Sequence, residues 1–281
     1  MVKSGIIKTN AVEIDWFTIT SFSYRFFEYW DNVARELCKE RLDAKQMQYI
    51  GNEYKLDTGT LRTMKGHQRG QQHWLVTCSG QLAHMLIDLV IGMYDEDIPF
   101  KCTRLDIQCT IERPKNYDSM ALMQAMSERK KNISYIRSGD KKAGRLATIG
   151  VGNRASQRYI RIYEKVLADD FIGLRLEAEY KGGLANNVLR DFSLDSTVLK
   201  ECLLHELLKM KSKWMEKAFY MAIDANQPRK ISGKVDKESK TKEWLISSCL
   251  PVLERIVRDH DNNGELAQLF LDIINHAVQG K

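Results

Sequence analysis

The segment from Arg154 to Lys165 holds side chains that could act on a phosphodiester. Its residues alternate in character with a period of two, which is typical of a β-strand with one buried face. Ile160 and Ile162 fall on one side of this strand. The opposite side carries two phenols and two cations: Tyr159, Arg161, Tyr163 and Lys165. A phenol with its ordinary pKa of about 10 is a poor nucleophile at neutral pH, so the flanking cations would have to favour the phenolate or hold the phosphate oxygens.

Two further predicted strands each place a carboxylate on their polar side. Asp106 lies in the segment 103–111 and Glu177 in the segment 174–181, and both segments alternate polar with apolar residues. If these strands share a sheet, one face is a hydrophobic floor for helices and the other gathers carboxylates, arginines and tyrosines. Asp106 and Glu177 would then offer hard oxygen ligands to Mg²⁺ or Mn²⁺. A polar, solvated sheet face is the alternative, and Glu179 fits either a third ligand or an ion-pair partner.

The elements that must position these residues indicate an α+β fold, an antiparallel sheet with helices on one face followed by an α-helical C-terminal segment. Strands are predicted at residues 12–20, 74–78, 103–112, 147–151, 157–165 and 173–181. Helices are predicted at residues 23–41, 81–92, 118–131, 194–217, 240–259 and 265–278. In the first strand, strict alternation puts Trp16 on the apolar side with Ile14, and Asp15 on the polar side.

The pattern changes to helices alone after Lys181-Gly182-Gly183. We therefore divide the chain into a catalytic domain, residues 1–183, and a helical segment, residues 184–281, that would recognise DNA or dimerise. Within the helical segment, residues 224–239 are polar and basic and contain Pro228 and Gly233, which predicts a linker or exposed loop.

Positive charge is clustered along this chain of net charge +6. Residues 129–165 hold eleven Lys or Arg against two acids, and residues 229–242 hold six against two. Such clustering is the footprint expected of a protein that contacts phosphate backbones, although a basic solvated surface gives the same count. The candidate nucleic-acid contacts, with Tyr159 either stacking on a base or serving as a second nucleophile, are Arg154, Arg158, Tyr159, Arg175, Arg229, Lys230, Lys234 and Lys237.

Composition favours a cytoplasmic protein without a membrane partner. No stretch of 18 apolar residues occurs, and the first residues lack the features of a signal peptide. The six cysteines are scattered and form no C-x-x-C pair, which predicts reduced core residues and neither disulfides nor a zinc site.

Five blocks in order resemble the replication initiation factor family (Rep_trans), whose members initiate rolling-circle replication of plasmids and some phages and include relatives that are relaxases of integrative elements. The blocks, which span roughly residues 12–215, are IDWFTIT at 14–20, TRLDI at 103–107, TIGVGNRAS at 148–156, RYIRIYEK at 158–165 and LRLE at 174–177. The resemblance implies that Tyr163 attacks a DNA phosphodiester and becomes linked to the 5′ phosphate. It also implies that Asp106 and Glu177 bind the divalent metal and that the last third of the chain helps to choose the origin. Glu164 departs from the usual Asp or Asn before the lysine.

These observations predict a site-specific DNA nicking and joining enzyme that starts rolling-circle replication. The alternatives are a relaxase of an integrative element, with the same chemistry, and a non-catalytic DNA-binding replication regulator. No His-x-His pair is present, so of the known metal-dependent nicking designs only one built on carboxylates is open to this chain. The expected partners are a single-stranded or extruded replication origin, a second copy of the chain in a homodimer, and a host helicase.

Overall fold

The computed structural model of the 281-residue chain describes residues 11–38, 44–46, 51–56, 58–68, 71–128, 132–137, 145–166 and 172–233. Its strands are β1 (Val12–Ser21), β2 (Ala44–Gln46), β3 (Gly51–Leu56), β4 (Gly59–Gln68), β5 (Gln71–Gly80), β6 (Lys101–Glu112), β7 (Ile133–Arg137), β8 (Arg145–Val151), β9 (Arg158–Val166) and β10 (Ile172–Lys181). Its helices are α1 (Tyr24–Cys38), α2 (Gln81–Asp95), α3 (Ser119–Ser127), α4 (Gly183–Leu194), α5 (Val198–Lys209) and α6 (Lys213–Ile223).

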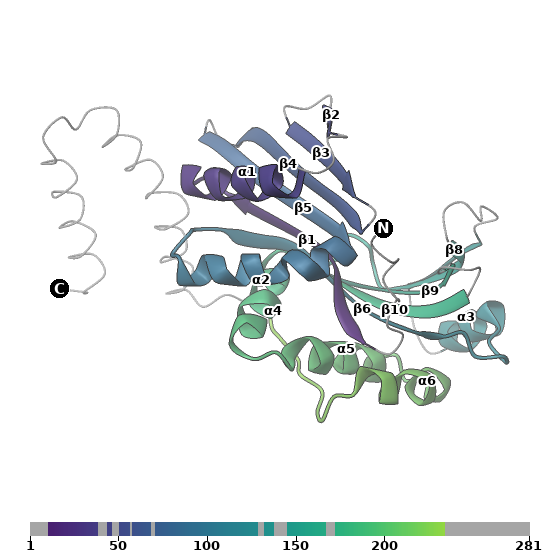
Figure 1. The fold of residues 1–281 in the computed structure, drawn as a ribbon. Helices are drawn as coiled ribbons and strands as arrows, with labels where there is room; N and C mark the ends of the chain where they lie inside the picture. Colours follow the sequence, from purple (N-terminus) through teal and green to yellow (C-terminus); the bar gives the residue numbers. More distant parts are fainter. Residues whose placement is uncertain are drawn as a thin grey trace, which may run out of the picture.

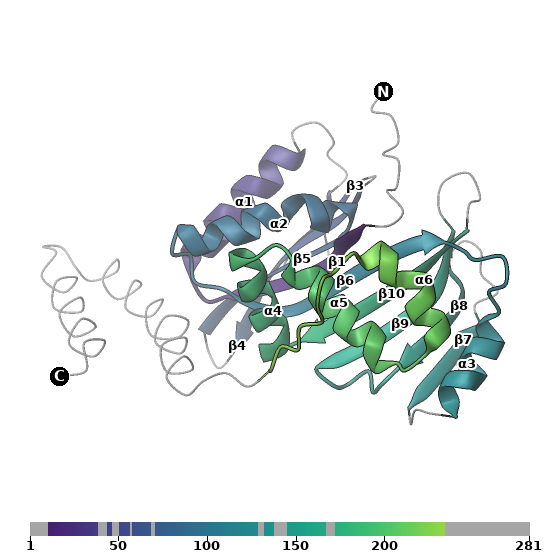
Figure 2. The same ribbon diagram turned by 90° about the horizontal axis from the view of Figure 1, so that it is seen from below.

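The strands form one sheet in the order β2-β3-β4-β5-β1-β6-β10-β9-β8-β7, and every neighbouring pair is antiparallel. The described helices lie on one face of this sheet, with α1 and α2 over the β1–β5 half and α4 to α6 over β6, β10 and β9 (Figures 1 and 2). The predicted α+β class, with an antiparallel sheet and helices on one face, is confirmed. The three strands 147–151, 157–165 and 173–181 are sequential neighbours, as their short connections indicated.

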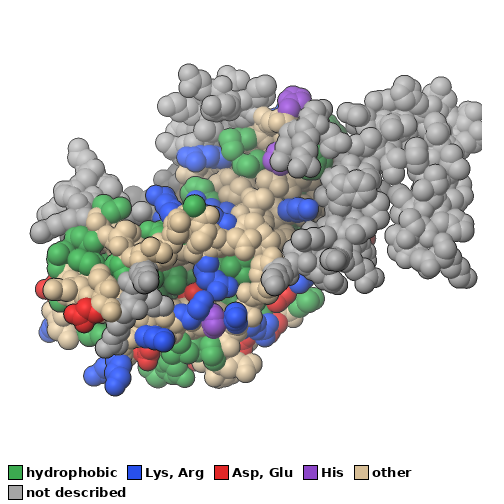
Figure 3. Space-filling view, turned by 180° about the vertical axis from the view of Figure 1, so that it is seen from behind, with side chains coloured by type: hydrophobic (Ala, Val, Ile, Leu, Met, Phe, Trp, Pro, Cys, Tyr) green, Lys and Arg blue, Asp and Glu red, His purple; other side chains and the backbone are tan. Residues whose placement is uncertain are grey.

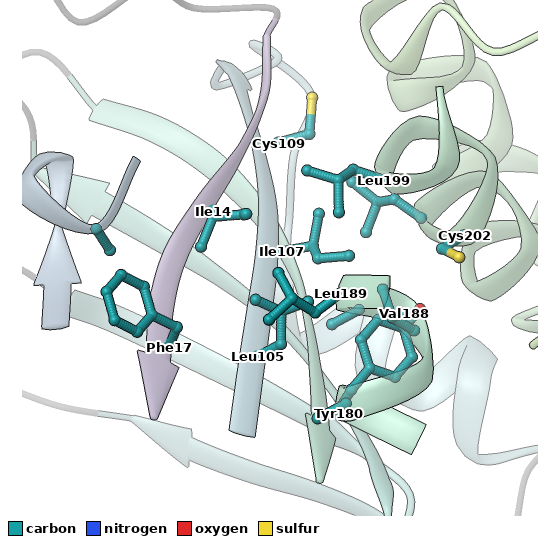
Figure 4. Close-up of a cluster of buried hydrophobic side chains, with 14 of the residues drawn as sticks. Ile14, Phe17, Leu105, Ile107, Cys109, Tyr180, Val188, Leu189, Leu199 and Cys202 are labelled. Atoms are coloured by element: carbon teal, nitrogen blue, oxygen red, sulfur yellow. The ribbon is translucent and has the colours of Figure 1, made fainter. Parts of the chain in front are cut away.

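A single hydrophobic core fills the space between the sheet and the helices. Figure 4 shows side chains of β1 and β6, among them Ile14 and Ile107, directed at leucines of α4 and α5. These side chains are removed from water, and the burial of such apolar area is the main favourable contribution to folding. The helices α4 to α6 therefore share a core with the strands, although the sequence analysis assigned them to a separate segment.

The prediction of one helix over residues 194–217 is wrong, because polar residues break this stretch twice. Asp195 accepts hydrogen bonds from the backbone N–H and the hydroxyl of Thr197. The turn formed in this way lies between the end of α4 at Leu194 and the start of α5 at Val198. Ser212 accepts from the backbone N–H of Met215 and caps α6, directly after Lys211 in the left-handed region at φ 54°. The predicted helices 240–259 and 265–278 lie outside the described residues.

A β-bulge in β1 overturns the predicted orientation of Trp16. Ile14 pairs with Ile107, but the next pair along β6 joins Asp106 to Trp16, so Asp15 is an extra residue on β1. Because side chains alternate with a period of two, one extra residue moves all that follow to the other face. Trp16 therefore shares the polar face with Asp106, and Phe17 takes the buried position.

Two predictions from composition can be compared with the described part of the chain. Cys78, Cys102, Cys109 and Cys202 are free cysteines and are buried, as predicted for core residues. None of the helices in the described ranges is long and apolar enough to span a membrane.

Candidate functional site

The sheet face opposite the helices carries the residues that the sequence predicted there. On β9 and β10, Tyr163 pairs with Arg175, Arg161 with Glu177 and Tyr159 with Glu179. On β10 and β6, Glu177 pairs with Gln108 and Glu179 with Asp106. Paired residues of antiparallel strands point to the same face, so the register brings Tyr163, Arg161, Glu177 and Asp106 together across three adjacent strands.

Tyr163 is bound to Glu177. Its hydroxyl donates a hydrogen bond of 2.7 Å to Glu177 Oε2, and the side chain is buried, with 1% of its surface exposed. Burial raises the pKa of the Tyr163 phenol, and the neighbouring Glu177 charge raises it further. In this conformation the phenol is protonated, with a carboxylate already in place to accept its proton.

Arg161 lies at the centre of the acidic residues. Its Nη2 atom is 3.0 Å from Asp106 Oδ2 and 3.4 Å from Glu179 Oε2, and it also donates to Glu177 Oε1. Only 11% of the Arg161 side chain is exposed. One guanidinium nitrogen thus contacts three carboxylates, all of them buried.

Arg104 and Lys181 complete the charge balance around this cluster. Arg104 binds Asp106 through Nε at 2.9 Å and through Nη2 at 2.6 Å, and Lys181 Nζ lies 2.7 Å from Glu179 Oε1. Burial raises the pKa of Asp106 to about 7, although the bonds from Arg104 oppose this. Burial acts in the same direction on Glu179, but Lys181, Arg104 and Arg161 outweigh it and lower the pKa of that carboxyl.

The oxygen atoms of Asp106 and Glu177, which lie on adjacent strands, are of the type that binds a hard divalent cation. Their arrangement does not fit a cation, because the guanidinium of Arg161 takes the position between those two carboxylates. Among the described residues no group of three or more His, Cys, Asp or Glu side chains is placed to hold a metal ion. A cation could bind here only after Arg161 moves.

Tyr159 lies on the same face but outside this cluster. Its hydroxyl is 3.5 Å from Ser134 Oγ and lies over the backbone of Gly150, where an added Cβ would come within 2.0 Å of that hydroxyl. Gly150 is therefore required by the close approach of the phenol. Tyr159 is packed on β8, whereas Tyr163 contacts the carboxylates.

Trp16 is a candidate that the sequence analysis missed, because the bulge at Asp15 could not be read from alternation. The Arg104 guanidinium carbon lies 4.7 Å from the centre of its ring, and the indole N–H donates to Thr18 Oγ1 at 2.9 Å. Trp16 is half-buried and directly opposite Asp106. A tryptophan held beside a guanidinium on a sheet face is a platform on which a nucleic-acid base can stack.

Three arginines predicted to contact DNA make ion pairs within the protein. Arg175 is buried on the polar face, where it donates to Asp15 and Thr110. Arg158 lies on the helix face and pairs with Glu206 of α5 at 3.0 Å. Arg229 pairs with Asp195 and with Glu201; its segment, residues 224–233, therefore lies against α4 and α5.

The other predicted DNA contacts that the structure describes are more exposed to solvent. Arg154, in the turn before β9, and Lys230 are exposed, and Lys165 is half-buried at the end of β9 on the face of Tyr163. Lys234 and Lys237 lie outside the described residues.

Figure 3 shows the molecule from the side opposite the α1 and α2 helices. Lys and Arg side chains are spread across the middle of that view, and acidic side chains are seen toward its lower part.

Comparison with known proteins gives only distant structural neighbours. No family model matches the chain, and no curated protein matches it. A rolling circle replication initiator protein from Geobacillus stearothermophilus aligns over 84% of this chain and 97% of its own, with 14% identity and a TM-score of 0.49. The di-domain ARO/CYC protein BexL from the BE-7585A biosynthetic pathway aligns over 64% and 75%, with 10% identity and a TM-score of 0.19. At these values neither neighbour decides the function.

Proposed function

We propose that this protein is a site-specific DNA nicking and joining enzyme that initiates rolling-circle replication through a covalent 5′-phosphotyrosine intermediate. The observation that carries the proposal is the hydrogen-bonded chain from Tyr163 through Glu177 and Arg161 to Asp106. It joins a nucleophile, a proton acceptor and a phosphate-binding cation on one sheet face. The five sequence blocks that resemble replication initiation factors contain all four residues.

Glu177 gives this reaction a proton acceptor. As the Tyr163 oxygen attacks the phosphorus in line, a Tyr–O–P bond forms, the P–O3′ bond breaks, and the phenolic proton passes to Glu177 at Oε2. The 3′ oxygen leaves and takes a proton from water. Reversal by a 3′ hydroxyl rejoins the strand without ATP, because the phosphotyrosine keeps the energy of the phosphodiester.

Arg161 and Lys165 flank Tyr163 on the same face and are the groups that would hold the non-bridging oxygens of the phosphate. A divalent cation bound by Asp106 and Glu177 would supply further stabilisation of the charge on the phosphate and on the leaving oxygen. We propose Mg²⁺ or Mn²⁺ for this role, because carboxylate oxygens are the ligands that both prefer.

The buried position of Tyr163 favours a flexible substrate. A phosphate held in a stiff duplex cannot be brought onto a phenol that lies at the level of the sheet, whereas a single strand can bend onto the face. We therefore propose a single-stranded or extruded origin as substrate. A relaxase of an integrative element would carry out the same chemistry on a transfer origin.

The test is to incubate the full-length protein with supercoiled plasmid carrying its own gene and flanking DNA, in the presence of Mn²⁺. We expect nicked circles with protein attached to the 5′ end, stable in detergent, and no nicks when EDTA is added or when the variants Asp106→Asn and Glu177→Gln are used. Nicks without attached protein would contradict the tyrosine mechanism, and full activity in EDTA would exclude the cation.

A non-catalytic DNA-binding regulator is the second candidate. The observation that favours it is that Tyr163 and the carboxylates are all buried and paired within the protein. Specific binding to the same DNA, with no cleavage of supercoiled plasmid or of single-stranded oligonucleotides under any cation, would support this candidate and refute the enzyme.

A further inference from the structure

Trp16 lies on the polar face of the sheet with part of its ring in reach of a ligand. The two phenols of this face, Tyr159 and Tyr163, are 8% and 1% exposed, whereas Trp16 is only half-buried. The bulge at Asp15 turns the indole to this face and leaves the neighbouring Phe17 in the core. The bulge thus takes a large aromatic ring out of the core and leaves some of its surface in contact with water.

Two contacts hold the indole of Trp16 in a defined orientation. Its N–H donates to Thr18 Oγ1 at 2.9 Å, and Thr18 Oγ1 lies 3.2 Å from Thr77 Oγ1 on β5. The guanidinium of Arg104, which is itself bound to Asp106, lies over the ring at 4.7 Å from its centre. A ring that is already held in place loses little conformational entropy when a flat ligand stacks on it.

The charged cluster beside Trp16 is balanced within the protein. It pairs three carboxylates with three cations, Asp106, Glu177 and Glu179 with Arg104, Arg161 and Lys181. This stretch of the face carries no net charge, so it has no long-range attraction for a phosphate backbone. The part of a nucleotide that suits the aromatic surface next to it is the uncharged part, the base.

The strand register gives the separation between Trp16 and the proposed nucleophile. Tyr163 pairs with Arg175, which pairs with Thr110 on β6. Trp16 pairs with Asp106, four residues from Thr110 along the same strand. Trp16 is therefore three strands from Tyr163, about 14 Å, and four residues along β6, about 13 Å, which places the two backbone positions about 19 Å apart. A base on Trp16 accordingly belongs to a nucleotide at a distance from the scissile phosphate, on one flank of it.

The other side of Tyr163 offers no comparable ring within the described strands. The residues that continue the polar face onto β8 and β7, none of them aromatic, are Thr148, Gly150, Ser134 and Ile136. Tyr159 covers Gly150 and is itself buried. Stacking on this face is therefore one-sided, on the flank that crosses β10 and β6 toward β1.

We propose that Trp16 is a base-binding subsite that holds one unpaired base of the DNA strand on a single flank of the nick. The inference rests on the proposed function for the position of the nick, and it needs no cleavage for the binding of the base. A base inside a duplex has both faces covered by its neighbours, so only an unpaired base can stack on the indole. Every base has such a face, so the subsite selects single strands without selecting a sequence.

The first measurement compares two single strands of equal length, one of thymidines and one of abasic sugar-phosphate units, which carry the same phosphates. Fluorescence anisotropy at fixed ionic strength, with full-length Tyr163→Phe protein so that no strand is cut, gives both affinities. The thymidine strand should bind about tenfold more tightly. Trp16→Leu in this background should reduce the affinity for the thymidine strand to that for the abasic strand. Trp16→Phe, the matched control, keeps an aromatic ring and should retain the preference.

The second measurement locates the subsite relative to the nick, in protein with Tyr163 unchanged. A single abasic unit is moved base by base through an oligonucleotide that contains the nick site mapped in the plasmid assay. Cleavage should fall about tenfold at one position, a few nucleotides from the nick and on one flank only. Trp16→Leu should remove this dependence on position.

Equal affinity for the thymidine and abasic strands would overturn the proposal, and this result needs no change at Trp16. A preference for bases that persists in Trp16→Leu protein of unchanged melting temperature would overturn it as well. Loss of cleavage at positions on both flanks would contradict the one-sided placement. A plasmid that is never nicked, with the preference for bases intact and dependent on Trp16, would refute the proposed enzyme and leave the subsite standing.

Discussion

Replacing Tyr163 with Phe removes one hydroxyl, and its hydrogen bond to Glu177 sets the expected size of the effect. That hydroxyl is buried and donates to a carboxylate at 2.7 Å, and a hydrogen bond to a charged group contributes about 1.5–3 kcal/mol to stability. Glu177 keeps its ion pair with Arg161, so the loss falls short of leaving a buried charge unpaired. We expect Tyr163→Phe to lower the free energy of unfolding by about 2 kcal/mol.

Tyr159→Phe is the matched control, because it makes the same chemical change on the same strand and face. Within the part of the chain that the structure describes, the one hydrogen-bonding contact of the Tyr159 hydroxyl is with Ser134 at 3.5 Å, which is at the limit of a hydrogen bond. Its loss should cost less than about 1 kcal/mol. The ring of Tyr159 remains packed over Gly150 in the variant.

Urea denaturation measures the two free energies, and the plasmid assay measures nicking by the same preparations. Tyr163→Phe should lose nicking and covalent attachment completely, and it should bind the origin oligonucleotide as the unchanged protein does. Its melting temperature should be roughly 4–8 °C lower, given about 2–4 °C per kcal/mol for a domain of this size. Tyr159→Phe should keep its nicking activity. If Tyr163→Phe were as stable as the unchanged protein, the hydrogen bond to Glu177 would be absent in solution. If Tyr159→Phe alone lost nicking, the nucleophile would be Tyr159.

Two further predictions concern DNA binding. Trp16→Leu should weaken the binding of a single-stranded oligonucleotide about tenfold, since stacking of a base on an aromatic ring contributes about 1–3 kcal/mol. Binding of duplex DNA should be nearly unchanged. Equal losses of affinity for both substrates in fluorescence titrations would contradict a stacking role. Lys230→Ala should reduce the slope of the logarithm of duplex affinity against the logarithm of salt concentration by about one unit, without lowering the melting temperature. Arg229→Ala, in contrast, should lower the melting temperature, because Glu201 loses its ion-pair partner. A change of salt slope in Arg229→Ala alone would reverse these two assignments.

Alternation in the sequence was sufficient to predict the faces of the side chains where β6, β9 and β10 pair with one another. These strands pair without a register shift between Gly173 and Lys181, so the period of two holds over that stretch. Hydrophobic residues on one face and charged residues on the other therefore located Asp106, Tyr163 and Glu177 on a common surface. The pairing itself, which puts Arg161 opposite Glu177, depends on strand order and could not be read from any one segment.

The errors occurred where the backbone departs from a regular repeat. The bulge at Asp15 inserts one residue into β1, and nothing in the alternation of Ile14, Asp15 and Trp16 indicates it. The break between α4 and α5 depends on Asp195 bonding to Thr197, a local turn that a count of leucines at helical spacing does not detect. The first departure moves Trp16 beside Asp106, and the second lets α4 and α5 pack separately on the sheet.

The partners of the charged residues explain why the sequence alone suggested two ligands for one face. Arg161 was assigned to a phosphate, and Asp106 and Glu177 to a cation, because each group was considered without the other. In the folded chain they neutralise each other, which is what buried charges require when neither ligand is bound.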